Sequence, residues 1–579
     1  MSHLVIVSNR GPFSFSEEFL KKAQACLKKG TEPEAPSFGE GGLVQAMAGL
    51  LKPGRWETTW IGASMGDCDI DVARGHYTGL FRKMKKANYA PDNFPHIEIQ
   101  REGRMHFKYK DYDFYMRFVF FDTKHMHSYY SKFANGFLWP LMHLTRPPLF
   151  YKKTPVFPRP HFVKNDFVQY TSSGVTFANT IIDETRKGMA VGKDEDNIVI
   201  WNQDYHLMQI AEVYKALLAE EGLSDQKRKR IHVGQFIHTP LFNIHEIQGL
   251  IREDKRQRVR AQVYDPFGET IETALQKLTW GMLSNDFIGF HTKEYCDHYL
   301  EALQEWFPVE IRIKDQFYEV IHQDSVTTIG AFPIGLDVDH ILSEVAKGER
   351  LNYELGGKSL YRQINNDRKA GRYIFGGLER CDYTKGLLAR LSIFEHALTK
   401  LRALKKDGRL YQVTAPSRSE SPDYQKLHAF LEESVTEINQ RIQDDPIIHI
   451  DQGLTAPQNY KFMKEIDVML VTPLEDGMNL VAFEYILSQK YRRPEERGIL
   501  VLSTSGAARV LKQEGFGVED GIVYVNPMSA KAAGEEVVQA LTQKKRLSER
   551  VIHYVETQRR VDEWADRNIE AIIHSRKAR

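Results

Sequence analysis

The sequence predicts an α/β protein made of two Rossmann-like, doubly wound domains, and three observations lead to this prediction. Buried-looking apolar runs at 4–7, 197–201 and 231–237 each end in polar residues and are followed by a helical pattern, as in a parallel sheet with crossover helices. The same alternation restarts in the second half of the chain. A length of 579 residues also exceeds what one ordinary core accommodates.

In the second half, the apolar runs favour five strands, at 373–377, 411–414, 447–450, 468–471 and 499–502. Residues 425–442 repeat apolar side chains at a spacing near 3.6, which predicts a helix. We therefore expect an N-terminal domain at 1–334, a C-terminal domain at 335–550 and a hinge near 332–337. The last helix, from about 530 to 577, is amphipathic and long enough to pack across both domains, with 551–579 crossing back to the first.

Two segments interrupt the alternation. Residues 13–40 are charged and punctuated by glycine and proline, which predicts a loop region. Residues 145–170 hold five prolines among aromatic residues, too many for a helix or a central strand. Loops of this length are often functional lids, so this insert is expected to be an ordered flap over a pocket or at a subunit contact.

The composition excludes several classes of protein. The 78 Lys and Arg residues nearly cancel the 77 Asp and Glu residues, which gives a net charge of +1; a protein that binds nucleic acid by neutralising phosphates carries a basic excess. Four cysteines show no CxxC or zinc-finger spacing. The N-terminus does not read as a signal peptide, and no apolar run is long enough to suggest a membrane span. We expect a cytoplasmic protein without nucleic-acid or membrane partners.

The stretch 471–484 combines features that suit an anionic ligand. A strand leads into a loop with two acids and Gly477, and then into a helix that starts near Asn479, Leu480 and Val481. The first turn of a helix offers unpaired backbone N–H groups, and glycine allows close approach. Glu484, farther along the helix, is placed to accept hydrogen bonds from a ribose diol. The alternative is ordinary capping of the helix by Asp476.

A second group of charges follows the strand at 373–377. Arg380 and Lys385 lie in the stretch ERCDYTKGL, just beyond a strand end. Two cations there suit a departing diphosphate, whose developing negative charge they would stabilise. The alternative is a surface arginine and lysine paired with Glu379 and Asp382.

In the first half, Asp204, His206 and His238 stand at strand ends, where functional groups of α/β domains gather. A histidine in such a place is also commonly a structural residue. A zinc site of the HExxH type is absent from the sequence, as are the GxSxG and phosphate-loop signatures in a suitable context.

Taken in order, these segments resemble the trehalose-6-phosphate synthase family, glycosyltransferase family 20, over residues 4 to about 508. The resemblance rests on several motifs: SNR at 8–10, GGL at 41–43, YYSKFANGFLWP at 129–140, WNQDYHL at 201–207, FIHTP at 236–240, DFIGFHT at 286–292, FPIGLD at 332–337, ERCDYTKGL at 379–387, APSR at 415–418 and DGMNLVAFEY at 476–485. It implies the GT-B fold, with two Rossmann-like domains that face a cleft.

The resemblance also implies the reaction. The activity would be retaining transfer of glucose from a nucleotide-glucose, with UDP-glucose as the preferred donor, to glucose 6-phosphate, without a cofactor or an essential metal. The attack would be front-face, with the leaving phosphate helping to deprotonate the acceptor hydroxyl. The donor would bind Gly42, Arg380, Lys385, Asn479, Leu480, Val481 and Glu484. The acceptor would bind Arg10, Tyr130, Trp139, Asp204 and Arg418. The catalytic group would be Arg380, Lys385, Asp204, His238 and Asp476, with His238 and Asp476 contacting the transferred glucose.

The sequence also departs from the family pattern. Ala63 replaces a family tryptophan of the acceptor site, and Gln203 replaces the usual histidine before Asp204. The alternatives are therefore a synthase with another phosphorylated acceptor, such as a glucosylglycerol-phosphate synthase that uses glycerol 3-phosphate, a pseudo-glycosyltransferase, a sugar-phosphate sensor without turnover, and a glycosidase. A separate phosphatase is expected to act on the product, and a homo-oligomer is left open.

Overall fold

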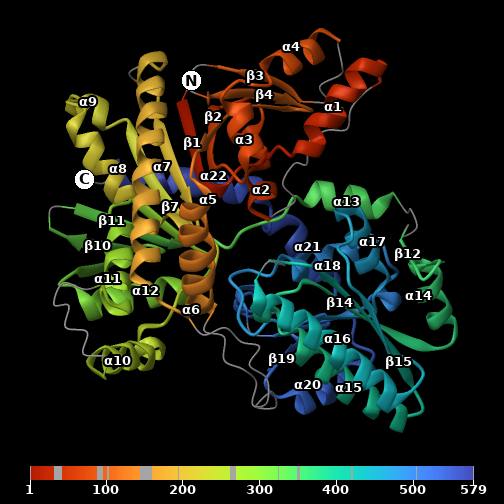
Figure 1. The fold of residues 1–579 in the computed structure, drawn as a ribbon. Helices are drawn as coiled ribbons and strands as arrows, with labels where there is room; N and C mark the ends of the chain where they lie inside the picture. The colour runs from red at the N-terminus through yellow and green to blue at the C-terminus, as the bar shows by residue number, and fades with distance from the viewer. Residues whose placement is uncertain are drawn as a thin grey trace. The chain divides into compact units, whose positions relative to one another are not determined.

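The computed structural model describes residues 2–31, 42–87, 95–100, 103–143, 160–193, 195–260, 269–323, 325–347, 353–418, 421–503 and 505–577. The chain divides into two compact units (Figure 1). Unit 1 comprises 1–139, 160–332 and 562–579, and unit 2 comprises 140–159 and 333–561. Among the described helices, none is both long and apolar enough to cross a membrane.

Unit 1 is built on an 11-stranded sheet of the described residues, in the order β3-β4-β5-β2-β1-β6-β7-β8-β11-β10-β9. The strands from β5 to β11 in this order run parallel, and antiparallel pairs extend both edges. The bounds are β1 (Ser2–Arg10), β2 (Trp56–Ala63), β3 (His96–Ile99), β4 (Met105–Tyr109), β5 (Tyr112–Val119), β6 (Ile198–Gln203), β7 (Ile231–Ile237), β8 (Phe287–Phe290), β9 (Glu310–Lys314), β10 (Phe317–His322) and β11 (Ser325–Ala331).

The central strands of unit 1 are buried on both faces, which explains their continuous apolar runs. Along β6, Ile198 and Ile200 pack in one cluster with Ile181 of α7 and Tyr214 of α8. Trp201 faces the other way, where its ring lies 5.4 Å from that of Trp564 in α22. Helices therefore cover both faces of this sheet.

The helices of unit 1 flank the sheet (Figure 1). They are α1 (Glu17–Lys29), α2 (Gly42–Met47), η1 (Ala48–Leu51), α3 (Asp67–Ala73), α4 (Thr78–Lys86), α5 (Thr123–Met126), the π-helix η3 (His127–Leu138), α7 (Lys164–Val191), η5 (Tyr205–Leu207), α8 (Ile210–Glu220), α9 (Asp225–Arg228), α10 (Ile244–Arg260), α11 (Ile271–Met282), α12 (Lys293–Trp306) and, from its second residue, α22 (Val561–Lys577). The short helix α6 (Trp139–His143) follows η3.

Unit 2 holds a six-stranded parallel sheet among the described residues, in the order β16-β15-β14-β17-β18-β19. Numbered along the unit, this order is 3-2-1-4-5-6, that of the dinucleotide-binding Rossmann fold. The bounds are β14 (Arg372–Arg380), β15 (Asp407–Ala415), β16 (Ile447–Ile450), β17 (Val468–Val471), β18 (Ile499–Ser503) and β19 (Ile522–Val525). A small hairpin, β12 (Glu354–Leu355) with β13 (Lys358–Ser359), precedes them.

The helices of unit 2 connect these strands. They are α13 (Val338–Ala346), α14 (Leu360–Lys369), η6 (Tyr383–Lys385), α15 (Leu387–Ala403), α16 (Pro422–Ile442), α17 (Ala456–Glu465), α18 (Leu480–Ser488), η7 (Pro494–Glu496), α19 (Gly506–Gln513), η8 (Val518–Asp520), α20 (Ala530–Thr542) and α21 (Glu549–Gln558). The eight strands and the helix at 425–442 that the sequence predicts are all present.

Two loop predictions are wrong in part. Within 13–40, residues 17–29 form α1, because Ser16 caps its start by accepting a hydrogen bond from the Phe19 amide and Gly30 ends it in the left-handed conformation. Within 145–170, α7 begins at Lys164, directly after the last proline-containing stretch. The rest of both segments falls largely on 32–41 and 144–159, outside the described residues.

The single helix predicted from about 530 to 577 is also wrong. The structure has α20, α21 and α22 in its place. Lys544 adopts a positive φ of 56° just after α20, and Ser548 starts a new helix by accepting a hydrogen bond from the Val551 amide. The chain breaks again at Arg559 and Arg560, between α21 and α22.

Candidate active site

In unit 2 the candidate residues gather where the strand order reverses, between the neighbouring strands β14 and β17. Ligands of doubly wound sheets bind beyond the carboxyl ends of the strands at this point. The loop after β14 and the loop after β17 meet there, because the Leu474 amide donates to the Thr384 carbonyl at 2.7 Å. Arg380, the last residue of β14, is exposed at this edge.

A polar network connects these two loops. The Lys385 ammonium forms an ion pair with Asp476. The Asn479 amide nitrogen donates to Glu379 at 3.0 Å and to Asp476 at 3.3 Å, and Glu379 also lies 3.5 Å from the guanidinium of Arg390. Asp476 therefore pairs with Lys385, and Glu379 lies closest to Arg390, while the charges of Arg380 and Lys385 also act on Asp382.

The start of α18 is shaped to face a ligand. Its N-cap residue, Asn479, makes no side-chain capping bond, which leaves the first backbone N–H groups of the helix, including those of Leu480 and Val481, without a side-chain acceptor from that residue. The preceding loop is held in place because the Gly506 amide donates to the Asp476 carbonyl at 3.0 Å. The resulting arrangement combines a helix N-terminus with the nearby charge of Lys385, a favourable setting for phosphate.

Gly386 fixes the distance between the two loops. It has a positive φ of 60°, and a Cβ there would lie 2.0 Å from the Thr472 carbonyl oxygen. We expect Gly386→Ala to lower the free energy of unfolding by about 3 kcal/mol, since backbone strain and overpacking both contribute. Thermal unfolding measures this. The control is Gly356→Ala, with a φ of 57° but nothing within 4 Å of the new methyl group; an equal loss in both variants would contradict the proposed steric contact.

Glu484 lies in α18 and is partly buried. Burial, together with the nearby charge of Glu379, raises the pKa of Glu484 to about 7. A carboxyl with this pKa binds and releases a proton near neutral pH, and such shifts are typical of functional sites.

Arg418 follows β15 and is held by two buried groups. Its guanidinium bonds the Tyr424 hydroxyl and lies 3.5 Å from Asp382. Asp382 is fully buried and also accepts hydrogen bonds from Tyr424 at 3.0 Å and from the Thr384 amide at 3.0 Å. Burial raises the pKa of Asp382, but the charges of Arg418 and Arg380 outweigh this and hold the pKa below its ordinary value. Arg418 itself adopts a positive φ of 48°, a strain that often marks functional positions.

In unit 1, Asp204 and His238 lie at the ends of the adjacent strands β6 and β7. Asp204 adopts a positive φ of 71° and accepts a hydrogen bond from the His238 amide at 3.2 Å. Burial raises the pKa of Asp204 to about 6 and lowers the pKa of His238 to about 3. His238 is therefore neutral at physiological pH, and its Nε2 bonds the Gln203 amide oxygen at 2.9 Å.

An aromatic chain connects this pair to Arg10. His206 lies 4.0 Å from Asp204 and stacks on Tyr130 at 5.5 Å, and the Arg10 guanidinium lies 5.5 Å from the centre of the Tyr130 ring. Tyr130 belongs to the π-helix η3, a rare conformation that is frequent at functional sites. Trp139 follows, with its ring 5.9 Å from Tyr205.

Gly42 is the first residue of α2, and its predicted place near the donor phosphates stays a prediction. Among the described residues, one group offers metal ligands close together: His428, Glu432 and Asp451, whose ligand atoms lie within 4.8 Å of one another. His428 already bonds Asp451 at 2.6 Å. None of these three residues is a predicted site residue, and we assign no metal to the group.

Comparisons with known proteins identify the family. The sequence matches Glycosyltransferase family 20 over residues 2–249 and 273–574. The chain belongs to glycosyltransferase family 20. It is 27% identical over 543 residues to the UDP-forming alpha,alpha-trehalose-phosphate synthase of Pichia angusta, covering 93% of this chain and 91% of that protein. It is also 27% identical over 547 residues to the 56 kDa subunit of the Saccharomyces cerevisiae enzyme, covering 93% and 87%.

Solved structures show the same fold. A UDP-forming alpha,alpha-trehalose-phosphate synthase from Burkholderia xenovorans, in complex with glucose-6-phosphate, superposes with a TM-score of 0.67 at 21% identity and covers 98% of this chain and 100% of its own. A trehalose-6-phosphate protein from E. coli bound with UDP-2-fluoro glucose gives a TM-score of 0.66 at 20% identity, covering 99% of each chain. The family 20 member described here therefore has the two Rossmann-like units of the GT-B fold.

The structure brings the predicted residues together within each unit. In unit 2 these are Arg380, Lys385, Asp476, Asn479, Leu480, Val481, Glu484 and Arg418, and in unit 1 they are Arg10, Tyr130, Trp139, Asp204 and His238. Asp382 and Tyr424, which hold Arg418, were not among the predicted site residues. A buried Asp inside a cationic motif is the signal that points to Asp382, whereas Tyr424 gives no signal in the sequence.

Proposed function

We propose that this family 20 glycosyltransferase transfers glucose from UDP-glucose to glucose 6-phosphate and forms α,α-trehalose 6-phosphate with retention. The observation that carries the proposal is the site at the strand reversal of unit 2, where Arg380 and Lys385 lie with the start of α18. This arrangement suits a diphosphate leaving group. The curated relatives named above are UDP-forming trehalose-phosphate synthases, which supports the choice of donor and product.

The donor is proposed to place its diphosphate against Arg380, Lys385 and the α18 amides, with Gly42 near the phosphates. Its ribose would bind Glu484. Asp476, oriented by Lys385 and Asn479, and the neutral His238 would contact the transferred glucose. With two cations and a helix N-terminus proposed to face the leaving group, we expect this transfer to need neither a cofactor nor an essential metal.

The acceptor is proposed to bind through its phosphate to Arg10, Tyr130 and Arg418, with Trp139 beside them. Asp204 would accept a hydrogen bond from the acceptor sugar near the reacting hydroxyl. For front-face attack, the leaving phosphate takes the proton of that hydroxyl, and the protein contributes position and charge. The predicted cytoplasmic location, separate phosphatase and homo-oligomer remain predictions.

A donor-by-acceptor matrix tests the proposal. UDP-, ADP- and GDP-glucose are each combined with glucose 6-phosphate and with glycerol 3-phosphate, and release of the nucleoside diphosphate is followed. We expect the highest kcat/KM for UDP-glucose with glucose 6-phosphate. A preference for glycerol 3-phosphate would favour the alternative acceptor. If neither acceptor led to nucleotide release, the proposed function would be contradicted.

The pH dependence of donor binding follows from Glu484. With its pKa raised to about 7, the carboxyl is protonated in the free protein at lower pH, and its contribution to stability is lost as the pH rises through 7. Ribose hydroxyls bind the ionised form best, so the affinity for UDP should fall by up to about tenfold per pH unit below 7. Calorimetric titration from pH 5.5 to 8 measures this.

Glu484→Gln should remove most of this pH dependence. The matched control is Glu212→Gln in unit 1, because burial also raises the pKa of Glu212. The control should keep the wild-type slope. A wild-type affinity that does not change with pH would contradict the role of Glu484 as the ribose acceptor.

A further inference from the structure

A cavity of unit 2 lies at the opposite edge of its sheet from the candidate active site. Its volume is about 590 Å³, within the range of small-molecule sites. Arg372 and Tyr373 line it at the start of β14, whereas Arg380 ends the same strand. A nine-residue strand spans about 26 Å at about 3.3 Å per residue, so the two sites are separate.

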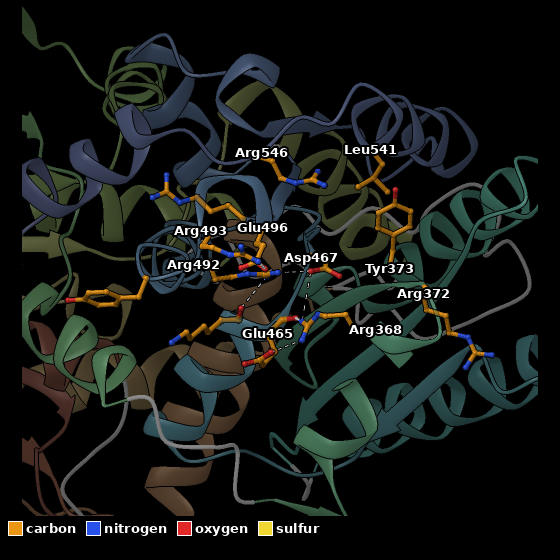
Figure 2. A pocket seen from close by; sticks show the side chains of 14 residues that line it. Arg368, Arg372, Tyr373, Glu465, Asp467, Arg492, Arg493, Glu496, Leu541 and Arg546 are labelled. Atoms are coloured by element: carbon orange, nitrogen blue, oxygen red, sulfur yellow. Dashed lines mark hydrogen bonds and ion pairs between the residues drawn. The ribbon is translucent and has the colours of Figure 1, made fainter. Parts of the chain in front are cut away.

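The lining is strongly basic. Of its 14 residues, seven are arginine or lysine and three are acidic. In Figure 2, dashed lines link both Arg368 and Arg492 to Asp467. The basic side chains of the lining thus outnumber its acidic ones by four, although Arg372 and Arg497 also pair with carboxylates outside the lining.

Four of these cations have structural partners that account for them, and one of the four, Arg493, pairs with Glu496. Arg368 pairs with Glu465 at 2.9 Å and Arg492 with Asp467 at 2.9 Å. Arg372 is held by Asp367 at 2.8 Å, by Asp407 at 3.0 Å and by Asp444. Arg492 also donates to the carbonyls of Lys464 and Ile466 at the end of α17, as expected of a cation at a helix C-terminus.

Other cations are left for a ligand. The hydrogen bonds of Arg546 go to the backbone carbonyls of Glu495, at 3.4 Å, and Lys545, at 2.7 Å, so they leave its charge uncompensated. Lys464 makes no ion pair among the described residues. Arg497 is 6% exposed, and although it bonds Glu549 at 2.7 Å, its Nε has no hydrogen-bond partner. An unsatisfied buried donor costs about 1 to 3 kcal/mol, and it indicates a missing acceptor.

We propose that this cavity binds a small phosphorylated metabolite that carries at least two negative charges. Phosphate oxygens supply the acceptors that Arg497 lacks and the charge that Lys464 and Arg546 need. Tyr373 and the half-exposed Tyr491 also line the cavity and offer rings against which a base or a sugar can stack.

The cavity is connected to the candidate active site through three elements. Each of β14, β17 and α18 has a proposed donor-site residue at or just beyond one of its ends. The cavity is lined by residues at or near the other end of each element: Arg372 and Tyr373 of β14, Asp467 before β17, and Tyr491 to Arg493 after α18. A bound anion that shifts these ends would alter donor affinity. This regulatory consequence rests on the proposed function, whereas binding to the cavity does not.

Binding of inorganic pyrophosphate to the full chain, followed by calorimetry, tests the proposal. Compared with the wild type, the double variant Lys464→Ala/Arg546→Ala should bind one equivalent of pyrophosphate fewer, or bind that equivalent at least tenfold more weakly. The control, Lys426→Ala/Arg441→Ala, removes the same two charges from exposed positions of α16 and should bind as the wild type does. If the double variant does not fold, the single variant Lys464→Gln tests pyrophosphate binding to the same cavity. Unchanged binding, or an equal loss in the control, would overturn the proposal.

Two further readings complete the experiment. ATP and a sugar bisphosphate are titrated in the same way, and the tighter ligand identifies a nucleotide or a sugar phosphate as the source. Turnover of UDP-glucose with glucose 6-phosphate, without added anion, should stay within twofold in both double variants. Loss of pyrophosphate binding with intact turnover supports the cavity site, whereas a wild type that binds pyrophosphate at this cavity but lacks turnover would count only against the proposed transfer.

Discussion

We expect Arg380→Ala to lower the turnover number of glucosyl transfer by about two to three orders of magnitude. Arg380 ends β14 and is exposed at the strand reversal of unit 2. The charge of its neighbour Lys385 is already shared with Asp476, whereas Arg380 makes no ion pair within 4.0 Å among the described residues, so we expect Arg380 to stabilise the leaving diphosphate most strongly. A preorganised donor of this kind lowers the barrier by about 3 kcal/mol.

The measurement is the steady-state rate of UDP release at saturating donor and acceptor. Because the Arg380 side chain is exposed, the variant should unfold at the wild-type temperature. Arg441→Ala provides the control, since Arg441 is 57% exposed and pairs with Glu395 on the surface, and it should keep full activity. A loss of tenfold or less in Arg380→Ala would remove Arg380 from the leaving-group site.

Asp382→Asn should cause the second large effect, because it breaks a buried ion pair. Asp382 is fully buried, lies 3.5 Å from the Arg418 guanidinium and accepts from Tyr424 at 3.0 Å. Removing one partner of a buried pair costs about 3 to 5 kcal/mol. We expect the free energy of unfolding to fall by this amount. The KM for glucose 6-phosphate should rise at least tenfold, because Arg418 loses the group that orients it.

Denaturant unfolding and acceptor kinetics measure the two effects. Asp423→Asn makes the same chemical change one residue before Tyr424, at a carboxylate that is 45% exposed, and it should change stability by about 0.5 kcal/mol or less. If Asp382→Asn lowered stability without changing the acceptor KM, Arg418 would have no part in acceptor binding.

The sequence predicted the fold well because both sheets are parallel and buried. Runs such as 231–237 and 468–471 are mostly apolar and buried on both faces, and polar residues follow at the edge where ligands bind. The ends of β14 and β17 were therefore identified together with Arg380, Lys385 and Asn479. Their adjacency follows from strand order, which local patterns do not reveal.

The wrong predictions have physical causes. Glycine and proline around 13–40 hid the capped helix α1, whose buried side is supplied by only two residues, Leu20 and Ala23. The continuous amphipathic pattern after 530 hid the breaks near Lys544 and Arg559, which depend on a local positive φ and on tertiary hydrogen bonds.

The sequence alone also could not predict which residues far apart in the chain pair with each other. Asp382 and Arg418 are separated by 36 positions in the chain, and the sequence suggested an acid partner for Arg380 or Lys385 instead. The cavity at the start of β14 was missed for the same reason, since Arg372, Lys464 and Arg546 come from separate elements. Single charged residues on helix ends usually indicate only solvated surface.

The central claim is that a nucleotide's departing phosphates are received by Arg380, Lys385 and the start of α18 while glucose moves to a phosphorylated sugar. Proton NMR of the reaction of UDP-glucose with glucose 6-phosphate tests it most directly. We predict equimolar UDP and a 1,1-linked disaccharide phosphate in which both anomeric protons show the small coupling of α-linkages. A β-linked product, free glucose in place of the disaccharide, or no UDP at all would contradict the account.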